Sequence, residues 1–194
     1  MKDKRKIILA TQNKDKILEI KNIMKGFDLI TLMDLNDNDD VIEDGNSFEE
    51  NARIKADYYF KKYNIPVIAD DTGLCVKSLN NEPGIFSARY SKSGKYEDNR
   101  QKLLENLYNV ENRDAFFSCV VCYIDEKSCV HYFEGRLNGC IIKEEKGKNG
   151  FGYDSIFKVD GYNKTLSEIS LDDKNKISHR FIAFSKLIEY LNKK

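Results

Sequence analysis

The spacing of hydrophobic residues changes repeatedly along this chain, and this change predicts strands that alternate with helices. Short apolar runs typical of buried strands occur at residues 6–10, 29–32 and 65–71. Between and after them, apolar residues recur every three or four positions, as on the buried face of a helix. The helices are expected to end at Gly26, to follow a capping box at Ser47 and Glu50, to cover residues 96–110, and to run from Ser170 to about Leu191.

The second half of the chain predicts a hairpin followed by a glycine-rich loop. Residues 116–124 and 129–142 are rich in valine, isoleucine and aromatic residues, which favour strands. The segment 143–157 contains several glycines, which permit close approach of the backbone to a ligand. The acidic segment 35–46 has few apolar residues and is expected to be a loop.

Length and charge narrow the class of protein. The chain has 194 residues, of which 41% are hydrophobic, so we expect a single domain over residues 1–194. Its 32 basic and 32 acidic residues leave no net charge, which argues against a nucleic-acid partner. The apolar run after the basic start is too short for a signal peptide, and no run is long enough to span a membrane, so we expect a cytoplasmic protein.

Five cysteines are present, and two of them form a C-x-x-C pair at Cys119 and Cys122. Residues three apart in a strand point to opposite faces, so this pair is not expected to hold a metal. We interpret all five cysteines as small buried hydrophobic residues.

Two adjacent carboxylates, Asp70 and Asp71, come at the end of the predicted strand 65–71, where residues 72–74 are expected to turn the chain. The carboxyl ends of strands are where open α/β sheets bind ligands. Two neighbouring carboxylates repel each other unless a cation or proton lies between them, so the pair favours a divalent metal. A solvated turn of Asp, Thr and Gly is the alternative interpretation of the pair.

Polar residues at 11–16 lie where a strand changes to a helix, so backbone N–H groups and two lysines converge. This arrangement is suited to phosphate binding. The alternative is that Asn13 caps the helix and the lysines are solvated.

Glu43 and Lys55 would each be ordinary surface charges if taken alone. They would gain a function if the acidic loop folds back over the Asp70–Asp71 pair. Three carboxylates could then hold Mg²⁺, and the lysine could pair with phosphates.

Two short motifs have side chains that are suited to binding a purine base. The segment 151–154, FGYD, offers an aromatic ring, a glycine and a carboxylate, and an aromatic anchor under a loop is the alternative. The segment 178–180, SHR, offers donors to a carbonyl at position six of a purine, and a surface salt bridge is the alternative. Arg180 is expected to flank the buried face of the last helix, and His179 to point away from it.

Taken in order, these segments closely resemble the noncanonical purine nucleoside triphosphate pyrophosphatases, the inosine triphosphate pyrophosphatase family, and most closely its bacterial members. The matching motifs are ATQNKDK at 10–16, EDGNSFEENARIKA at 43–56, IADDTGLCV at 68–76 with PGIFSARYS at 83–91, FGYDSIF at 151–157 and KNKISHR at 174–180.

The resemblance implies an α/β fold with an elongated mixed β-sheet, flanked by helices, in two lobes around a central substrate cleft. It further implies a homodimer that hydrolyses ITP, dITP and XTP, with Mg²⁺, to the monophosphate and pyrophosphate. The role of the enzyme would be to clear these nucleotides from the cellular nucleotide pool.

The resemblance also implies a role for individual residues. Asp71 would accept the proton of the attacking water, and Asp70 beside it would support the metal site. Lys55 and Lys174 would neutralise phosphate charge. Glu43 and Asp71 would bind the metal. The residues implied to contact substrate are Thr11, Gln12, Asn13, Lys14, Asp15, Lys16, Thr72, Phe151, Gly152, Tyr153, Asp154, Lys174, His179 and Arg180.

Three positions depart from the common wording of the family: Gln12 replaces a small residue, Thr72 a serine and Ser155 a proline.

A Maf-like nucleotide pyrophosphatase, which prefers pyrimidine or modified nucleotides, is the alternative enzyme. A module that binds a triphosphate without cleaving it is the alternative outside catalysis, although such a module needs no acidic metal site.

Overall fold

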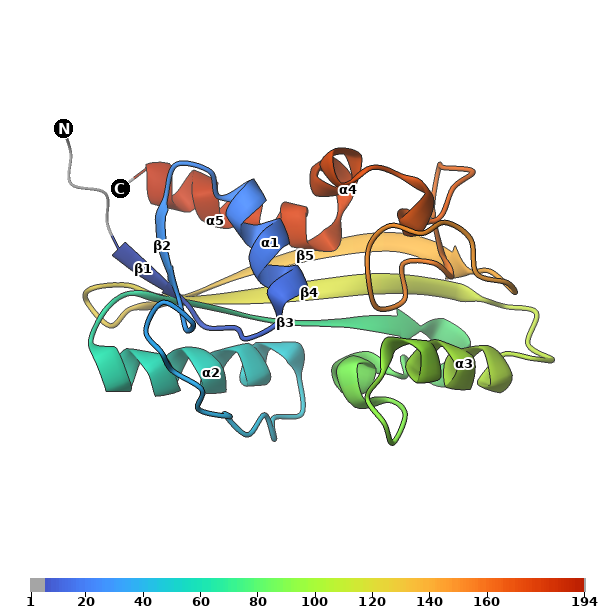
Figure 1. Ribbon diagram of the computed structural model, residues 1–194, viewed down its shortest axis with the longest axis horizontal. Coiled ribbons are helices and arrows are strands. Elements are labelled where there is room, and N and C mark those ends of the chain that lie inside the picture. The colour runs from blue at the N-terminus through green and yellow to red at the C-terminus, as the bar shows by residue number, and fades with distance from the viewer. Residues whose placement is uncertain (1–5, 194) are drawn as a thin grey trace. The chain divides into compact units, whose positions relative to one another are not determined.

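A computed structural model describes residues 6–193, and within them six strands form one mixed sheet (Figure 1). The strand order is β2-β1-β3-β4-β5-β6. β1 is parallel to β2 and β3, whereas β5 and β6 are antiparallel. The predicted mixed sheet with flanking helices is confirmed, and the basic start at residues 1–5 lies outside the described residues. The strands are β1 (Lys6–Leu9), β2 (Asp28–Thr31), β3 (Val67–Val76), β4 (Asp114–Ile124), β5 (Val130–Ile141) and β6 (Phe157–Val159).

The helices begin at the caps that the sequence predicts. Asn13 caps the first helix, and Ser47 Oγ accepts the N–H of Glu50 at 3.1 Å at the start of the second. The Glu50 carboxylate accepts the N–H of Asn46, at 2.6 Å, so the predicted capping box is only half formed. The helices are α1 (Lys14–Ile23), α2 (Phe48–Tyr63), α3 (Tyr96–Asn106), α4 (Leu171–Ile177) and α5 (His179–Asn192), with short 3-10 segments at Lys77–Leu79, Gly84–Arg89 and Leu166–Glu168.

The chain divides into two compact units, and β3, β4 and β5 each run from one into the other. Unit 1 comprises residues 6–71, 119–135 and 180–193 of the described part. Unit 2 comprises Thr72–Ser118 and Arg136–His179. The single domain and the cleft between lobes stay predictions.

Unit 1 has three layers, with the sheet between α1 and α5 on one face and α2 on the other (Figure 1). Alternate residues of β1 separate the two cores. Ile7 and Leu9 pack with α1 and α5, whereas Ile8 packs with α2. This alternation is the expected pattern for a strand that is buried on both faces.

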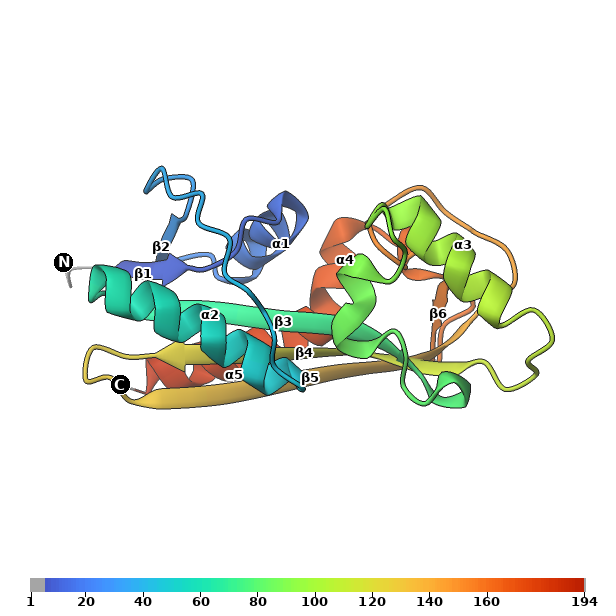
Figure 2. The ribbon, with the colours of Figure 1, turned by 90° about the horizontal axis from the view of Figure 1, so that it is seen from below.

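Unit 2 has its own core, to which α3 and parts of β3, β4, β5 and β6 contribute. Leu103 of α3 and Leu107, which directly follows this helix, are fully buried in it, as the helical pattern predicts. Figure 2 shows the short segment Gly84–Arg89 beside α3, and Asn99 of α3 donates to the carbonyl of Ala88 at 3.1 Å. These contacts hold the 83–91 motif against the helix.

The prediction that the third strand ends at Asp71 is wrong. β3 continues without a turn to Val76, so Asp70 and Asp71 lie in its middle. Leu74 and Val76 are fully buried, and Gly73 does not have the positive φ that a tight turn would use. Burial of the following apolar residues therefore extends the strand through the polar segment.

The prediction of one helix from Ser170 to about Leu191 is also wrong, because Ser178 separates α4 from α5. Ser178 is fully buried and extended, with φ −66° and ψ 154°. His179 therefore begins a new helix. It is 3% exposed and its ring stacks on Phe117 at 4.7 Å, so it does not point away from the core as expected.

The cysteine interpretation holds for Cys75, Cys119 and Cys122, which are buried. Cys119 and Cys122 belong to different cores of unit 1, which agrees with their opposite faces. Cys129 is exposed and Cys140 half-buried, so the prediction is wrong for these two. The exposure of both residues follows from their positions, since Cys129 lies in the hairpin turn and Cys140 lies near the end of β5. Among residues 6–193, no helix combines the length and apolar character needed to cross a membrane.

Candidate active site

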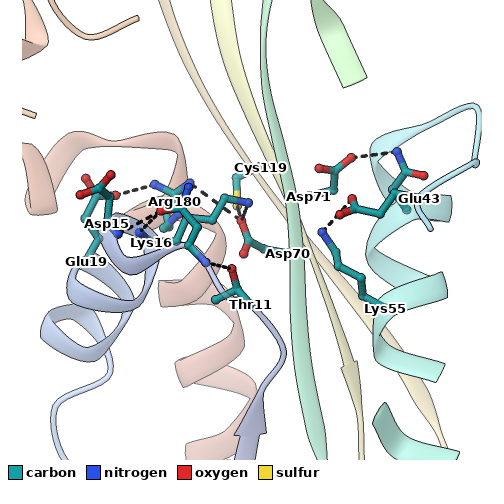
Figure 3. A network of polar contacts seen from close by, with 12 residues as sticks. Thr11, Asp15, Lys16, Glu19, Glu43, Lys55, Asp70, Asp71, Cys119 and Arg180 are labelled. Atoms are coloured by element: carbon teal, nitrogen blue, oxygen red, sulfur yellow. Dashed lines mark hydrogen bonds and ion pairs between the residues drawn. The ribbon is translucent and has the colours of Figure 1, made fainter. Parts of the chain in front are cut away.

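Asp70 and Asp71 point to opposite faces of the sheet in unit 1 (Figure 3). Successive side chains in a strand alternate between the two faces, and both residues lie inside β3. The prediction that the two carboxylates share one exposed strand end, with a cation between them, is therefore wrong. Each carboxylate has its own set of partners.

The Asp70 carboxylate belongs to a buried cluster of charges with Lys16, Glu19 and Arg180 (Figure 3). Lys16 Nζ lies 2.9 Å from Asp70 Oδ2, and Arg180 Nη2 lies 3.8 Å from the same oxygen. Arg180 Nη1 donates to Glu19 Oε2 at 2.5 Å. The thiol of Cys119 lies 4.0 Å from Asp70 Oδ2. Two cations thus face two carboxylates, so the charges of the cluster balance; Asp70, Glu19 and Arg180 are buried, and the Lys16 side chain is 16% exposed.

Burial alone would raise the pKa of Asp70, but Lys16 and Arg180 outweigh it and hold that pKa far below its usual range. Burial likewise works to lower the pKa of Lys16, and the Asp70 carboxylate reverses this, so the net shift is upward. Asp70, Lys16 and Arg180 therefore keep their charges at neutral pH.

The Asp71 carboxylate lies on the other face, with residues of α2 and of the acidic loop. Asn51 Nδ2 donates to Asp71 Oδ2 at 3.1 Å. Lys55, one helical turn further along α2, pairs with Glu43 Oε2 at 2.9 Å. Figure 3 shows Asp71, Glu43 and Lys55 on the same side of β3. The predicted folding back of the acidic loop therefore brings Glu43 to Asp71 and Lys55.

Burial raises the pKa of Asp71, and the nearby Glu43 carboxylate adds to this shift. Lys55, Lys16 and the hydrogen bond from Asn51 oppose it without cancelling it. A carboxylate with a raised pKa is a better proton acceptor than an ordinary aspartate. Asp71 is thus electrostatically suited to general-base chemistry.

The donor set on this face fits a magnesium ion. Glu43 and Asp71 supply hard oxygen ligands, and their mutual repulsion would be relieved by a cation. In the described part of the chain, no three or more His, Cys, Asp or Glu side chains gather as a metal cluster. Asp70 does not join the other two because it points to the opposite face. Mg²⁺ commonly uses one or two carboxylates and takes its remaining ligands from phosphates and water.

The segment before and into α1, residues 11–16, places several of the predicted phosphate ligands in unit 1. Asn13 Oδ1 accepts the N–H groups of Asp15 at 2.9 Å and Lys16 at 3.1 Å. Asn13 therefore caps α1, as the alternative to phosphate binding expected. Thr11 Oγ1 accepts the N–H of Asn13 at 3.2 Å. Lys14 is exposed, whereas Lys16 points inward to Asp70. The positive end of α1 therefore lies beside the Asp70 cluster.

Gln12 connects this segment to the acidic loop. Its side-chain Nε2 donates to the carbonyl of Asp39 at 2.9 Å. Lys62 of α2 pairs with Asp37 at 2.7 Å and with Asp39 at 2.6 Å, and Tyr63 donates to Asp37 at 2.5 Å. The loop that carries Glu43 is thereby attached to α2 and to Gln12.

Unit 2 contains Phe151 and Asp154, which the resemblance assigns to the base, and Lys174, which it assigns to phosphate charge. Lys174 Nζ lies 2.5 Å from Asp154 Oδ2 and 4.7 Å from the centre of the Phe151 ring. The same carboxylate oxygen accepts the N–H of Phe151 at 2.9 Å. Lys174 and Asp154 are both buried, and Phe151 is half-buried. The structure therefore brings these three predicted residues together.

The other members of this loop are held by α3 and by the 83–91 segment. Arg100 Nη1 donates to the carbonyl of Gly152 at 2.8 Å, and Tyr153 OH donates to the carbonyl of Ser87 at 2.9 Å. Gly152 has a φ of 61°, a conformation that favours glycine. Thr72, the first residue of unit 2, is half-buried in β3.

Glu19, Asn51 and Arg100 contact predicted site residues but were not among the predictions. Glu19 looks like a surface residue of an amphipathic helix, yet it is 2% exposed. Asn51 shares a helix face with Lys55, which was the available signal. Arg100 has no sequence signal, because its partners, the Gly152 carbonyl and the Glu145 carboxylate at 3.0 Å, lie far along the chain.

The mixed sheet, together with carboxylates and lysines gathered around β3, defines an α/β protein with a candidate hydrolase site. Residues 7–190 match the Ham1 family. The chain belongs to this family.

Two curated relatives illustrate the match. The chain is 46% identical over 195 residues to the dITP/XTP pyrophosphatase of Thermoanaerobacter pseudethanolicus, covering 97% of this chain and 98% of the relative. It is 48% identical over 186 residues to the protein of the same name in Staphylococcus epidermidis, covering 95% of each.

Solved structures agree with these relatives. The Ham1 protein of Staphylococcus aureus superposes with a TM-score of 0.89 at 40% identity, covering 97% of this chain and 99% of that one. A nucleoside-triphosphatase / dITP/XTP pyrophosphatase from Mycobacterium abscessus gives a TM-score of 0.77 at 36% identity, covering 94% and 98%. The resemblance inferred from the sequence motifs is confirmed.

Proposed function

We propose that this protein is a nucleoside triphosphate pyrophosphatase that hydrolyses dITP, ITP and XTP to the monophosphate and pyrophosphate. Membership of the Ham1 family carries this proposal, because curated relatives over nearly the whole chain are named dITP/XTP pyrophosphatases. The presence of Glu43, Lys55 and Asp71 in one group supports catalysis rather than binding alone.

In the proposed reaction, Asp71 accepts the proton of the attacking water, and its raised pKa favours this role. Lys16 and Lys55 neutralise phosphate charge, helped by the N-terminus of α1 behind Thr11 and Asn13. Asp70 keeps Lys16 in place through their ion pair of 2.9 Å.

Glu43 and Asp71 would hold Mg²⁺. When bound, the ion would polarise the phosphate oxygens and offset their charge. Lys55 is close enough to Glu43 to compensate its charge before substrate binds, at 2.9 Å.

In unit 2, Phe151 would stack on the purine, with Gly152, Tyr153 and Asp154 forming the rest of that loop. Stacking on an aromatic ring contributes about 1–3 kcal/mol per base. Lys174 already lies over the Phe151 ring and so fixes its orientation.

The donors assigned to the purine edge are His179 and Arg180. A guanidinium carries five N–H donors, so pairing with Glu19 is compatible with donation to a purine carbonyl. Hypoxanthine and xanthine have a carbonyl at position six where adenine has an amino group, and this difference favours them over ATP.

The Maf-like alternative is not favoured, since the chain matches the Ham1 family and its curated relatives are named dITP/XTP pyrophosphatases. A homodimer and a cytoplasmic location, with neither nucleic acid nor membrane as a partner, complete the proposal. Light scattering of the purified protein would test the dimer.

A parallel assay of pyrophosphate release from ITP, dITP, XTP, GTP, ATP and UTP tests the substrate class. Release from ITP, dITP and XTP well above that from ATP is expected, and its loss in Asp71→Asn excludes a contaminant. Preference for UTP would favour the Maf-like enzyme instead, and release from none of them would favour a binding module.

A further inference from the structure

Asn51 has the most informative contacts of the residues around Asp71 that have no assigned role. It lies in the second turn of α2 and is 1% exposed. Its Oδ1 accepts the N–H of Gly45 at 2.9 Å, and its Nδ2 donates to Asp71 Oδ2 at 3.1 Å. One amide group therefore joins the acidic loop to β3.

The orientation of this amide follows from its partners. Gly45 presents an N–H donor, and Asp71 presents a carboxylate that only accepts when ionised. Turning the amide over would place donor against donor and acceptor against acceptor. The two hydrogen bonds thus form or break together, unless one end of the side chain is altered.

The close approach of the loop depends on the glycine at position 45. A Cβ on Gly45 would lie 2.8 Å from Asn51 Oδ1 and 2.7 Å from the Cβ of Glu50. No ordinary side chain fits at these distances. The chain is therefore built so that the backbone of the acidic loop can reach the Asn51 amide.

The segment that this contact fixes is the one that carries Glu43. Gly45 is two residues beyond Glu43, and Asn46 donates to Glu50 at 2.6 Å just after it. Lys55 holds the Glu43 carboxylate itself at 2.9 Å. α2 thus fixes the loop immediately around the proposed metal ligand.

We propose that Asn51 is a positioning residue that holds the Asp71 carboxylate and the Glu43 loop in one fixed geometry. This inference rests on the proposed function, because it concerns the same two carboxylates. The bond to Asp71 Oδ2 sets the rotation of the carboxylate, and the bond to Gly45 sets the position of the loop. Mispositioning a reacting group by about 1 Å can reduce turnover about 100-fold.

Two variants separate the two contacts. Asn51→Ala removes both hydrogen bonds. Asn51→Asp keeps an acceptor for the Gly45 N–H but replaces the donor to Asp71 with a second carboxylate. We expect kcat and kcat/KM for ITP to fall together by about 10- to 100-fold in both variants, as for other residues that orient a reacting group.

Asp125→Ala is the matched control, because it removes another buried polar side chain that holds a loop in unit 1. Asp125 is 1% exposed, and its Oδ1 accepts the N–H groups of Lys127 and Cys129, each at 2.9 Å. Asp125 lies in the turn between β4 and β5, so its loss is expected to lower the melting temperature and leave kcat near the wild-type value.

Hydrogen–deuterium exchange over residues 40–46 gives a readout that does not depend on turnover. Exchange there should rise in Asn51→Ala and stay near the wild-type rate in Asn51→Asp. A wild-type kcat in Asn51→Asp would overturn the proposed action on Asp71. Unchanged exchange in Asn51→Ala would overturn the proposed action on the loop. Wild-type protein that releases no pyrophosphate from ITP would instead contradict the proposed function, and the exchange result would still decide the loop contact.

Discussion

Replacing Glu19 with glutamine tests whether the buried charge cluster around Asp70 is held together by its balance of charge. Glu19 and Arg180 are 2.5 Å apart, with side chains 3% and 2% exposed. Glu19→Gln keeps the shape of the side chain but leaves Lys16 and Arg180 facing Asp70 alone. The cluster then carries one excess positive charge beside the buried Arg180.

The magnitude follows from the distances. At an effective dielectric constant of about 20, two unit charges 2.5 Å apart, the separation of Glu19 and Arg180, attract each other with about 7 kcal/mol, and the cost of burying both charges offsets part of this attraction. Removing one partner of a buried pair typically costs about 3–5 kcal/mol of unfolding free energy. We expect a loss in this range for Glu19→Gln. It would be a large part of the total free energy of unfolding, which is typically about 5–15 kcal/mol for a folded protein.

The assay is urea unfolding of wild type, Glu19→Gln, Lys16→Met and the double variant. Lys16 and Arg180 repel each other, as the lowering effect of Arg180 on the pKa of Lys16 indicates. Removing Lys16 as well as Glu19 restores a neutral cluster of Asp70 and Arg180. The double variant should therefore lose less stability than the sum of the single variants, by about 1–3 kcal/mol.

Additive losses, within about 0.5 kcal/mol, would refute the reasoning that charge balance stabilises this cluster. A loss below about 1 kcal/mol for Glu19→Gln alone would also refute it, since this is the size expected for exposed ion pairs.

Three further predictions follow from individual contacts. Contacts with Lys62 and Tyr63 lower the pKa of Asp37 from 3.8 to about 2, so this carboxylate stabilises the fold above pH 4 and the benefit disappears as pH falls through about 2. Asp37→Asn should cost about 1–2 kcal/mol at pH 7, and the difference in urea unfolding should shrink in acid. Lys174→Met leaves the buried Asp154 without its cation, and urea unfolding should show a loss of about 3–5 kcal/mol, whereas a loss typical of an exposed pair would argue against the buried contact. Gln12→Ala removes an exposed hydrogen bond, so stability should change by less than about 0.5 kcal/mol while hydrogen exchange at residues 37–40 rises; unchanged exchange would count against this tether.

The sequence predicts the elements of this fold well where apolar residues recur regularly. The helix behind Ser47 and the strands of the hairpin appear where the pattern places them. The pattern fails at β3 and at Ser178, where the outcome depends on tertiary burial. A polar Asp-Asp-Thr-Gly segment looks like a turn locally, yet it forms a strand because apolar residues on both sides of it are buried.

The motifs predict the candidate site residues, but they do not predict which other residues contact them. The motifs identify Glu43, Lys55 and Asp71, which the fold brings to one face. Sequence reasoning could not separate Asp70 from Asp71 because the strand was expected to end there. Glu19 was also missed, because a carboxylate on a helix is normally solvated unless a distant cation such as Arg180 pairs with it.

The identity of the products formed from dITP tests the central claim most directly. Phosphorus NMR of a reaction with Mg²⁺ should show pyrophosphate and dIMP in equal amounts, and Asp71→Asn should form neither above background. Orthophosphate and dIDP as the first products would contradict the account, because they would place the cleavage between the β and γ phosphates.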